Sequence, residues 1–96
     1  MSAFVIVDTK IENPQAYEVY KKLAQPIAQK YKGVYRARGG KMDVRETALW
    51  EPTRMVIIEF PDRYHAQAFV DSKEYQPVQA LRHQHAECTL FILEGV

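Results

Sequence analysis

The stretch Gly33–Lys41, which reads Gly-Val-Tyr-Arg-Ala-Arg-Gly-Gly-Lys, sets the order of the elements on either side of it. Gly33 follows a long amphipathic pattern and is expected to end a helix as a left-handed cap. Residues 34–38 are typical of a short strand, and Gly39-Gly40 suits a tight turn with positive φ. The stretch therefore predicts a helix, a strand and a turn in immediate succession.

Two arginines lie two residues apart in this predicted strand. On a regular strand alternate side chains share a face, so Arg36 and Arg38 would point to the same side as Val34. Tyr35 and Ala37 would point to the other side. We interpret Arg36 as a peripheral charge and Arg38, at the end of the strand, as the residue with a functional role.

The chain before this stretch predicts a buried strand and a long helix. Ala3–Val7 is apolar at every position, which is typical of a central strand that is covered on both faces. Asn13 is a good N-cap, and Pro14 fits the first helical position. Pro26 is expected to kink this helix rather than end it, because the apolar spacing continues past it. The inner face of the helix recurs at spacings of three and four residues, at Tyr17, Tyr20, Ala24, Ile27 and Tyr31.

The chain after the stretch predicts a strand and a second helical region. Met42–Glu46 alternates weakly and suits a short returning strand, and Thr47–Thr53 is typical of a loop. Arg54–Phe60 gives the strongest strand pattern in the chain. Asp62 is expected to cap a helix, and Ser72 to cap a further helical turn. One stripe of this helical region carries Tyr75, Val78, Leu81, Arg82 and His85.

The order of elements, closed by a last strand over Thr89–Glu94, is β-α-β-β-α-β. This is the order of the ferredoxin-like fold, an α+β architecture with both helices on one face of a four-stranded antiparallel sheet. We expect residues 1–96 to form one such domain. The strands are also apolar on their other face, which predicts a homodimer in which two sheets close face to face into a barrel.

Composition excludes several classes of protein. The 96 residues carry 13 Lys and Arg against 12 Asp and Glu, so the net charge is +1, and there is no basic block. Binding to nucleic acid or to an anionic membrane is therefore not expected. Ala3–Val7 is too short for a signal peptide or a membrane span, and the single Cys88 fits a reducing compartment. These features favour a cytoplasmic protein.

No constellation in the sequence points to a metal ion or a nucleophile. His83 and His85 would diverge by about 200° on a helix, and no Cys, Asp or Glu stands beside them at ligand spacing. Ser72 is better explained as a helix cap, and Gly39-Gly40 lacks the rest of a phosphate-binding loop. We therefore expect neither a metal nor a cofactor.

Several short motifs together resemble the DUF1330 family over essentially the whole chain. They are Asn13-Pro14-x-x-Tyr17, Tyr-Arg-Ala-Arg-Gly-Gly-Lys at 35–41, Ile58-Glu59-Phe60-Pro61, Ser72-x-Glu-Tyr-Gln-Pro77 and Glu94-Gly95. The resemblance implies a homodimer of the dimeric α+β barrel superfamily. The function of the family is undefined, and superfamily relatives such as cofactor-free monooxygenases, muconolactone-type isomerases and haem-dependent enzymes do not fix it. Residues at family motif positions include Arg38, Gly39, Gly40, Glu59, Ser72, Tyr75 and Arg82.

The remaining polar residues suggest one candidate site, between the sheet and its helices. A guanidinium beside a carboxylate, ringed by phenols, can bind a small acid and move a proton. We expect Arg38 and Glu59 to form this pair, with Glu59 as the proton acceptor. Ligand-binding roles are expected for Arg82, Tyr75, Tyr17, Tyr20, Trp50 and His85.

Two functions remain open from the sequence. In the first, the homodimer binds a small acidic or aromatic compound in this pocket, with a cofactor-independent enzyme of the oxygenase or isomerase type as one form of it. In the second, the protein is a non-catalytic homodimeric binding or stress-associated module. The Arg38–Glu59 pair would then only stabilise the fold, and the tyrosines would fill core space.

Overall fold

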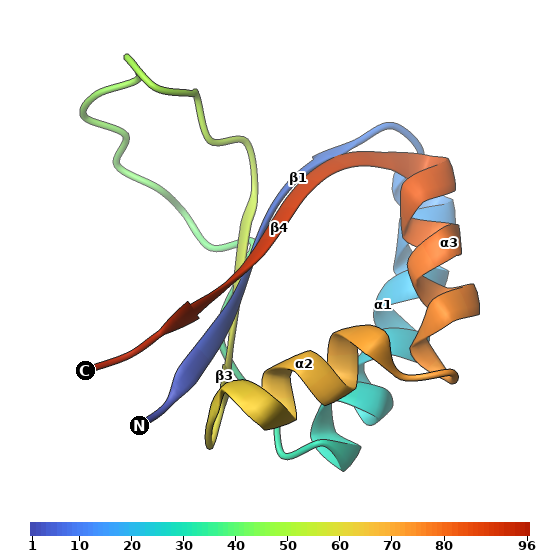
Figure 1. Cartoon of the computed structure of the whole chain (residues 1–96). Coiled ribbons are helices and arrows are strands. Elements are labelled where there is room, and N and C mark those ends of the chain that lie inside the picture. The colour runs from blue at the N-terminus through green and yellow to red at the C-terminus, as the bar shows by residue number, and fades with distance from the viewer.

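Four strands pair into one antiparallel sheet in the computed structural model, which describes residues 1–96 (Figure 1). The order across the sheet is β2-β3-β1-β4, so the first and third strands are central. This arrangement confirms the predicted α+β, ferredoxin-like fold, although the two outer segments of the chain form longer strands than expected. The strands are β1 (Ala3–Ile11), β2 (Val34–Arg38), β3 (Met55–Phe60) and β4 (Ala86–Glu94).

Three helices cover one face of this sheet and leave the other face open (Figure 1). The predicted caps are confirmed: Asn13 accepts from the amide of Ala16, and Asp62 accepts from that of His65. The hydroxyl of Ser72 accepts from the amide of Tyr75, so a new helix begins after the extended backbone at Ser72. The helices are α1 (Pro14–Lys30), which continues through Pro26, α2 (Arg63–Asp71) and α3 (Tyr75–His85).

The core lies between the helices and the inner face of the sheet. Alternate residues of β1 and β3 are buried there, in the period of two that a half-covered strand requires. An aromatic stack fills the centre, with the ring of Phe69 5.5 Å from Phe60 and 4.4 Å from Tyr75. Small side chains of the helices allow close approach to the sheet, at Ala24, Ala28 and Ala66.

The predicted left-handed cap at Gly33 is wrong, because the residue with positive φ is Lys32 at +69°. Gly33 serves another purpose. A Cβ atom there would lie 2.8 Å from the ring of Phe60 and 2.9 Å from the carbonyl oxygen of Ala28. The glycine therefore allows the chain to pass close to the core as it leaves α1.

The predicted returning strand at Met42–Glu46 is also absent. Residues 40–53, which we call the arm, contain neither helix nor strand and extend from the sheet on the side opposite the helices (Figure 1). Asp8 holds the base of the arm, since its carboxylate accepts from Trp50 Nε1 at 2.9 Å and from the amides of Thr53 and Arg54 at 2.9 and 3.0 Å. These three bonds fix the end of the arm against β1.

Acid is expected to release the base of the arm. Burial alone would raise the pKa of Asp8, but the hydrogen bonds from Thr53, Arg54 and Trp50 outweigh it and hold that pKa below 3.8. A depressed folded-state pKa means that the stabilisation is complete above the ordinary value and is lost as the pH falls through the lowered one.

Trp50 is the single tryptophan, so its fluorescence emission reports on this contact, and it should change as the pH falls below about 3.8. In the Asp8→Asn variant, the emission at neutral pH should already equal that of the wild-type protein in acid. A wild-type emission that stays constant through this acid range, under conditions where circular dichroism shows a folded protein, would contradict the assignment of Asp8.

Candidate functional site

A β-bulge in β2 decides which arginine faces the helices. Tyr35 pairs with Ile58 and Ala37 pairs with Ile57, so Arg36 is the extra residue between them. Arg38 consequently pairs with Val56, a residue of the inner face, and shares that face with Tyr35. The prediction that Arg36 and Arg38 point the same way is wrong, because it assumed a regular strand.

The guanidinium of Arg38 lies over the ring of Tyr35, at 4.4 Å from its centroid. It also reaches α1, where it donates to Gln25 Oε1 at 2.7 Å and to the carbonyl oxygen of Lys21 at 3.0 Å. Neither partner is charged, and Arg38 forms no salt bridge. Its positive charge is therefore available to a ligand.

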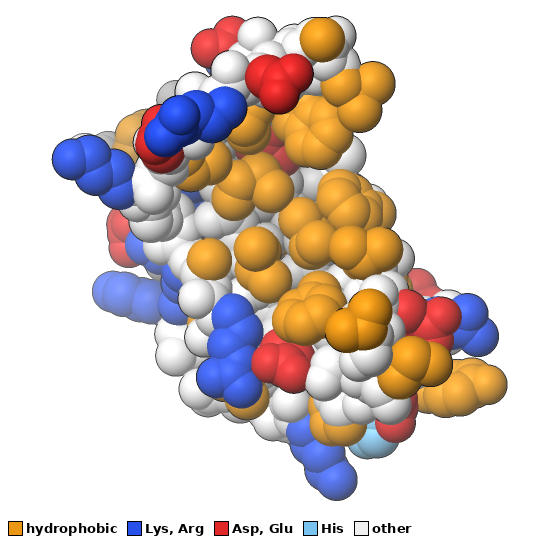
Figure 2. All heavy atoms as spheres, turned by 90° about the vertical axis from the view of Figure 1, so that its left-hand side faces the viewer, with side chains coloured by type: hydrophobic (Ala, Val, Ile, Leu, Met, Phe, Trp, Pro, Cys, Tyr) orange, Lys and Arg blue, Asp and Glu red, His pale blue; other side chains and the backbone are white.

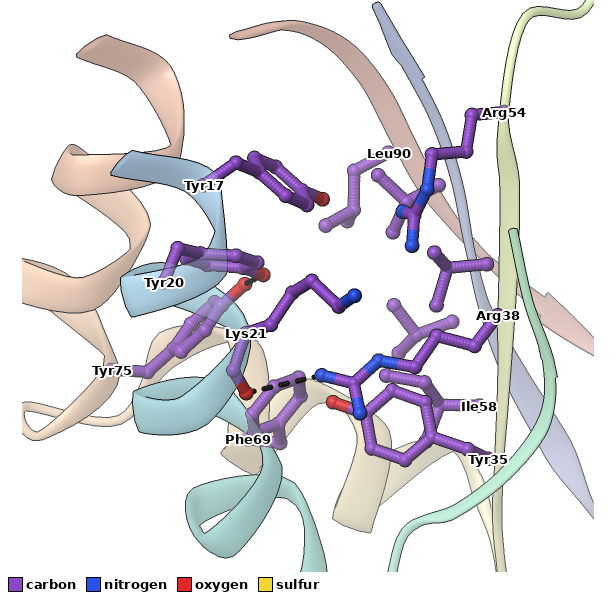
Figure 3. Close-up of a pocket in the computed structure, with 13 residues that line it drawn as sticks. Tyr17, Tyr20, Lys21, Tyr35, Arg38, Arg54, Ile58, Phe69, Tyr75 and Leu90 are labelled. Carbon is purple, nitrogen blue, oxygen red and sulfur yellow. Dashed lines mark hydrogen bonds between the residues drawn. The ribbon is translucent and has the colours of Figure 1, made fainter. Parts of the chain in front are cut away.

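A cavity lies beside Arg38, between α1 and the inner face of the sheet (Figure 3). Its free volume is about 20 Å³, which is room for about one water molecule. Aliphatic side chains of the sheet form one wall, and aromatic side chains of the helices form the other. The residues that line it are Val5, Val7, Tyr17, Tyr20, Lys21, Tyr35, Arg38, Arg54, Val56, Ile58, Phe69, Tyr75 and Leu90.

The charged residues of this lining are all cations. Besides Arg38 they are Lys21 and Arg54, and the guanidinium of Arg54 lies 5.4 Å from the ring centroid of Tyr17. Lys21 is paired with Glu18 at 3.1 Å, an exposed carboxylate outside the cavity. No carboxylate lines the cavity, so the site favours an anion.

The phenols of the cavity are neutral hydrogen-bond donors. The hydroxyls of Tyr20 and Tyr75 lie 2.7 Å apart, and one proton of the pair is free to bond to another group. Burial raises the pKa of Tyr20, and it also raises those of Tyr17 and Tyr35. These groups stay protonated at neutral pH and can therefore donate to an anion.

Arg82 is buried near Tyr20 and Tyr75 and does not line the cavity. It is 2% exposed, its NH2 group donates to Gln79 at 3.2 Å, and its Nε has no partner. Burial works to lower the pKa of Arg82, but the neighbouring Tyr75 and Tyr20 more than offset this and leave it raised. The guanidinium adds positive charge without a carboxylate beside it.

The predicted Arg38–Glu59 pair is not formed. Glu59 pairs across the sheet with Val34 and lies on the open face, where it accepts from Ser2 at 2.7 Å and from Arg36 at 2.8 Å. These two hydrogen bonds hold the pKa of Glu59 below its ordinary value, and the bond from Ser2 has the larger effect. Because of the bulge, Arg38 points inward and Arg36 is the arginine beside Glu59. The sheet itself separates Glu59 from the cavity.

Two further expected ligand-binding residues lie away from the cavity. Trp50 belongs to the arm and is bonded to Asp8, and the side chain of His85 lies at the end of α3. Tyr17, Tyr20 and Tyr75 do line the cavity together with Arg38.

Three polar residues of the cavity were not predicted from the sequence: Lys21, Tyr35 and Arg54. The signal for Arg54 was present, because it lies two and four residues before the inward Val56 and Ile58. Lys21 and Tyr35 carried no comparable signal.

Lys21 and Arg38 separate the cavity from solvent. Both also line a shallow outer depression of about 160 Å³, together with Glu18, Lys22 and Gln25. The side chain of Lys21 is 28% exposed, so it can turn outward without unpacking the core. Movement of these two side chains would open the cavity from that depression.

Gly39 positions the second arginine. Its φ is +69°, and a Cβ atom there would lie 2.6 Å from Arg54 Nε. Gly39→Ala should destabilise the protein by about 1–2 kcal/mol in urea denaturation, because a left-handed conformation is strained in any residue with a Cβ. Gly40→Ala is the matched control, since nothing lies within 4 Å of its added atom. Equal losses in the two variants would argue against this account of Gly39.

The structure contains no group of three or more His, Cys, Asp or Glu side chains that could hold a metal ion. None of its helices combines the length and the apolar character that a transmembrane span needs.

Comparisons with solved structures give the same fold. A protein of unknown function from Rhodopseudomonas palustris aligns with a TM-score of 0.74 at 15% identity, over 99% of this chain and 82% of its own. A dimeric ferredoxin-like protein of unknown function from Jannaschia gives 0.69 at 16%, over 99% and 100%. An antibiotic biosynthesis monooxygenase gives 0.55 at 19%, over 100% and 99%. At these identities the likeness shows the fold alone.

Sequence comparisons are more specific about the family. No curated protein matches the chain. The model of the DUF1330 family, described as a domain of unknown function, matches residues 2–96. The resemblance seen in the sequence is thereby confirmed, and this chain belongs to the DUF1330 family.

Proposed function

We propose that this protein binds a small organic acid in the cavity between α1 and the sheet. One observation carries the proposal: Arg38 and Arg54 line a largely apolar cavity that contains no carboxylate, and neither arginine forms a salt bridge. A ligand carboxylate would accept charge-assisted hydrogen bonds from the two arginines, and its apolar or aromatic body would contact Val56, Ile58 and the other aliphatic side chains.

The free volume of the cavity, about 20 Å³, is too small for an organic acid until side chains move. Entry of an acid of the size of benzoate would displace Lys21 and shift Arg38, the two side chains that separate the cavity from solvent. The two hydrogen bonds from Arg38 to Gln25 and Lys21 would then be exchanged for bonds to the ligand. Because both present acceptors are neutral, an anionic acceptor is a stronger partner for the guanidinium.

Binding is better supported than catalysis. No carboxylate, imidazole or thiol lines the cavity, and burial raises the pKa values of Tyr17, Tyr20 and Tyr35. Without Glu59 in the cavity, the site lacks the proton acceptor that the sequence had suggested. We therefore place a binding role before an oxygenase or isomerase type of reaction. The non-catalytic alternative from the sequence included a structural ion pair between Arg38 and Glu59. The ion pair that forms is instead between Arg36 and Glu59.

We further propose that the protein is a homodimer that associates through the open face of the sheet. Apolar side chains gather on this face, as Figure 2 shows, and Val34 of β2 and Phe91 and Leu93 of β4 are 47%, 38% and 53% exposed. A contiguous apolar surface of this kind marks an interface. The relative from Jannaschia, described as dimeric, supports the same assembly. A cytoplasmic location stays a prediction.

A thermal-shift experiment tests the binding role. Benzoate should raise the melting temperature by about 4 °C or more near saturation, because a ligand of the folded state stabilises it by mass action. Benzamide, which has the same ring without the charge, should have little effect, and sodium chloride at equal concentration controls for ionic strength. If neither benzoate nor other small aliphatic and aromatic acids raise the melting temperature above the chloride control, the proposal fails.

A further inference from the structure

The arm exposes a series of apolar side chains. Leu49 is 88% exposed, Trp50 48%, Val44 44% and Met42 37%. A loop of this length without secondary structure is uncommon in a compact domain and is usually functional. Exposed apolar side chains gathered on one segment require an explanation that a scattered few would not.

The arm and the open face of the sheet form one continuous surface. In Figure 1 the arm projects beyond the open face, away from the helices, and in Figure 2 apolar side chains run from the sheet onto it. The hydrogen bond from Trp50 to Asp8, a residue of β1, joins the two regions. Any molecule seated on the open face would therefore lie beside the arm.

We propose that the arm is an interaction surface for a second copy of this chain, and that through its two ends it holds the arginines of the cavity in place. The inference rests on the proposed homodimer. A stable interface involves about 20–30 residues a side, which the outward residues of four short strands do not reach by themselves. The open face and the arm together reach that number, and two-fold symmetry would place each arm against the opposite subunit.

The ends of the arm coincide with the cavity. Arg38 lies two residues before its first residue, and Arg54 directly follows its last. The side chain of Arg54 passes over the α-carbon of Gly39, where a Cβ atom would lie, so the two ends of the arm are also in contact with each other. A partner that restrains the arm would therefore also restrain both guanidiniums before the acid binds. Association and acid binding would then strengthen each other.

Sedimentation velocity on Leu49→Asp tests the contact. We expect wild-type protein to dimerise, and the charge to raise the dissociation constant of the dimer at least tenfold with an unchanged circular dichroism spectrum. Leu23→Asp is the matched control, because Leu23 is 47% exposed on α1, and it should dimerise like wild type. Leu49→Ser replaces the aspartate variant if that variant does not fold.

The outcomes separate the two proposals. A wild-type dimer with the same dissociation constant in the Leu49 variant overturns the role of the arm and leaves the dimer intact. A wild-type protein that is monomeric at every concentration overturns both. For the link to the cavity, the monomeric Leu49 variant should bind benzoate at least threefold more weakly than the wild-type dimer. Equal affinities would overturn that link while leaving acid binding itself in place.

Discussion

Phe69→Ala is expected to lower the free energy of unfolding by about 3–5 kcal/mol. The side chain is 1% exposed and stacks against Phe60 and Tyr75, so its removal leaves a cavity at the centre of the core. A small domain has about 5–15 kcal/mol of stability in total. The variant should therefore unfold at much lower urea concentration than wild type, measured by circular dichroism at fixed protein concentration.

Tyr64→Ala is the control for this prediction. Tyr64 belongs to the same helix but is 73% exposed, so its removal should change stability by no more than about 0.5 kcal/mol. Similar midpoints for the two variants would show that Phe69 does not hold the helices to the sheet.

Arg38→Met is expected to weaken benzoate binding by tenfold or more. A hydrogen bond to a charged group contributes about 1.5–3 kcal/mol, and about 1.4 kcal/mol corresponds to a factor of ten. Methionine keeps much of the apolar stem that contacts Tyr35 while removing the charge. Isothermal titration calorimetry at equal ionic strength measures the change.

Arg36→Met supplies a close control, because Arg36 has the same chemistry two residues away. It lies on the other side of the bulge and pairs with Glu59, so its removal should leave benzoate affinity unchanged. An equal loss of affinity in both variants would mean that general positive charge, rather than the direction of Arg38, attracts the acid.

Local sequence signals were sufficient for most of the fold. Asn13-Pro14 and Asp62 each begin a helix by a contact within four residues, and such contacts can be predicted from neighbours in the chain. The buried strands Ala3–Ile11 and Met55–Phe60 could be recognised by their apolar residues. The order of these elements then left few topologies open, and the ferredoxin-like one is found.

The site depended on contacts between segments that are distant in the sequence. The bulge in β2 arises from its pairing with β3, and the pattern Val-Tyr-Arg-Ala-Arg does not reveal it. As a result, the shared direction of Arg36 and Arg38 and the partner of Glu59 were both predicted wrongly, although Arg38 was correctly expected in the pocket. Trp50 was assigned to the pocket, whereas Asp8, far away in sequence, holds it at the base of the arm.

The inward direction of Arg54, in contrast, could have been predicted from the sequence, because it follows from the alternation of strand residues alone. It shares a parity with Val56 and Ile58, and β3 has no bulge between them. Applying the strand period to the charged residue as well as to its apolar neighbours would have placed a second guanidinium in the cavity.

Nitrogen-15 NMR of the arginine side chains tests the central claim most directly, namely that Arg38 and Arg54 bind a small acid in this cavity. The Nε–H signals are assigned with single Arg→Lys variants and followed while benzoate is added at constant ionic strength. We predict saturable shifts for Arg38 and Arg54 and none for Arg36. Signals of Arg38 and Arg54 that do not move, or that move no more than that of Arg36, would contradict the account.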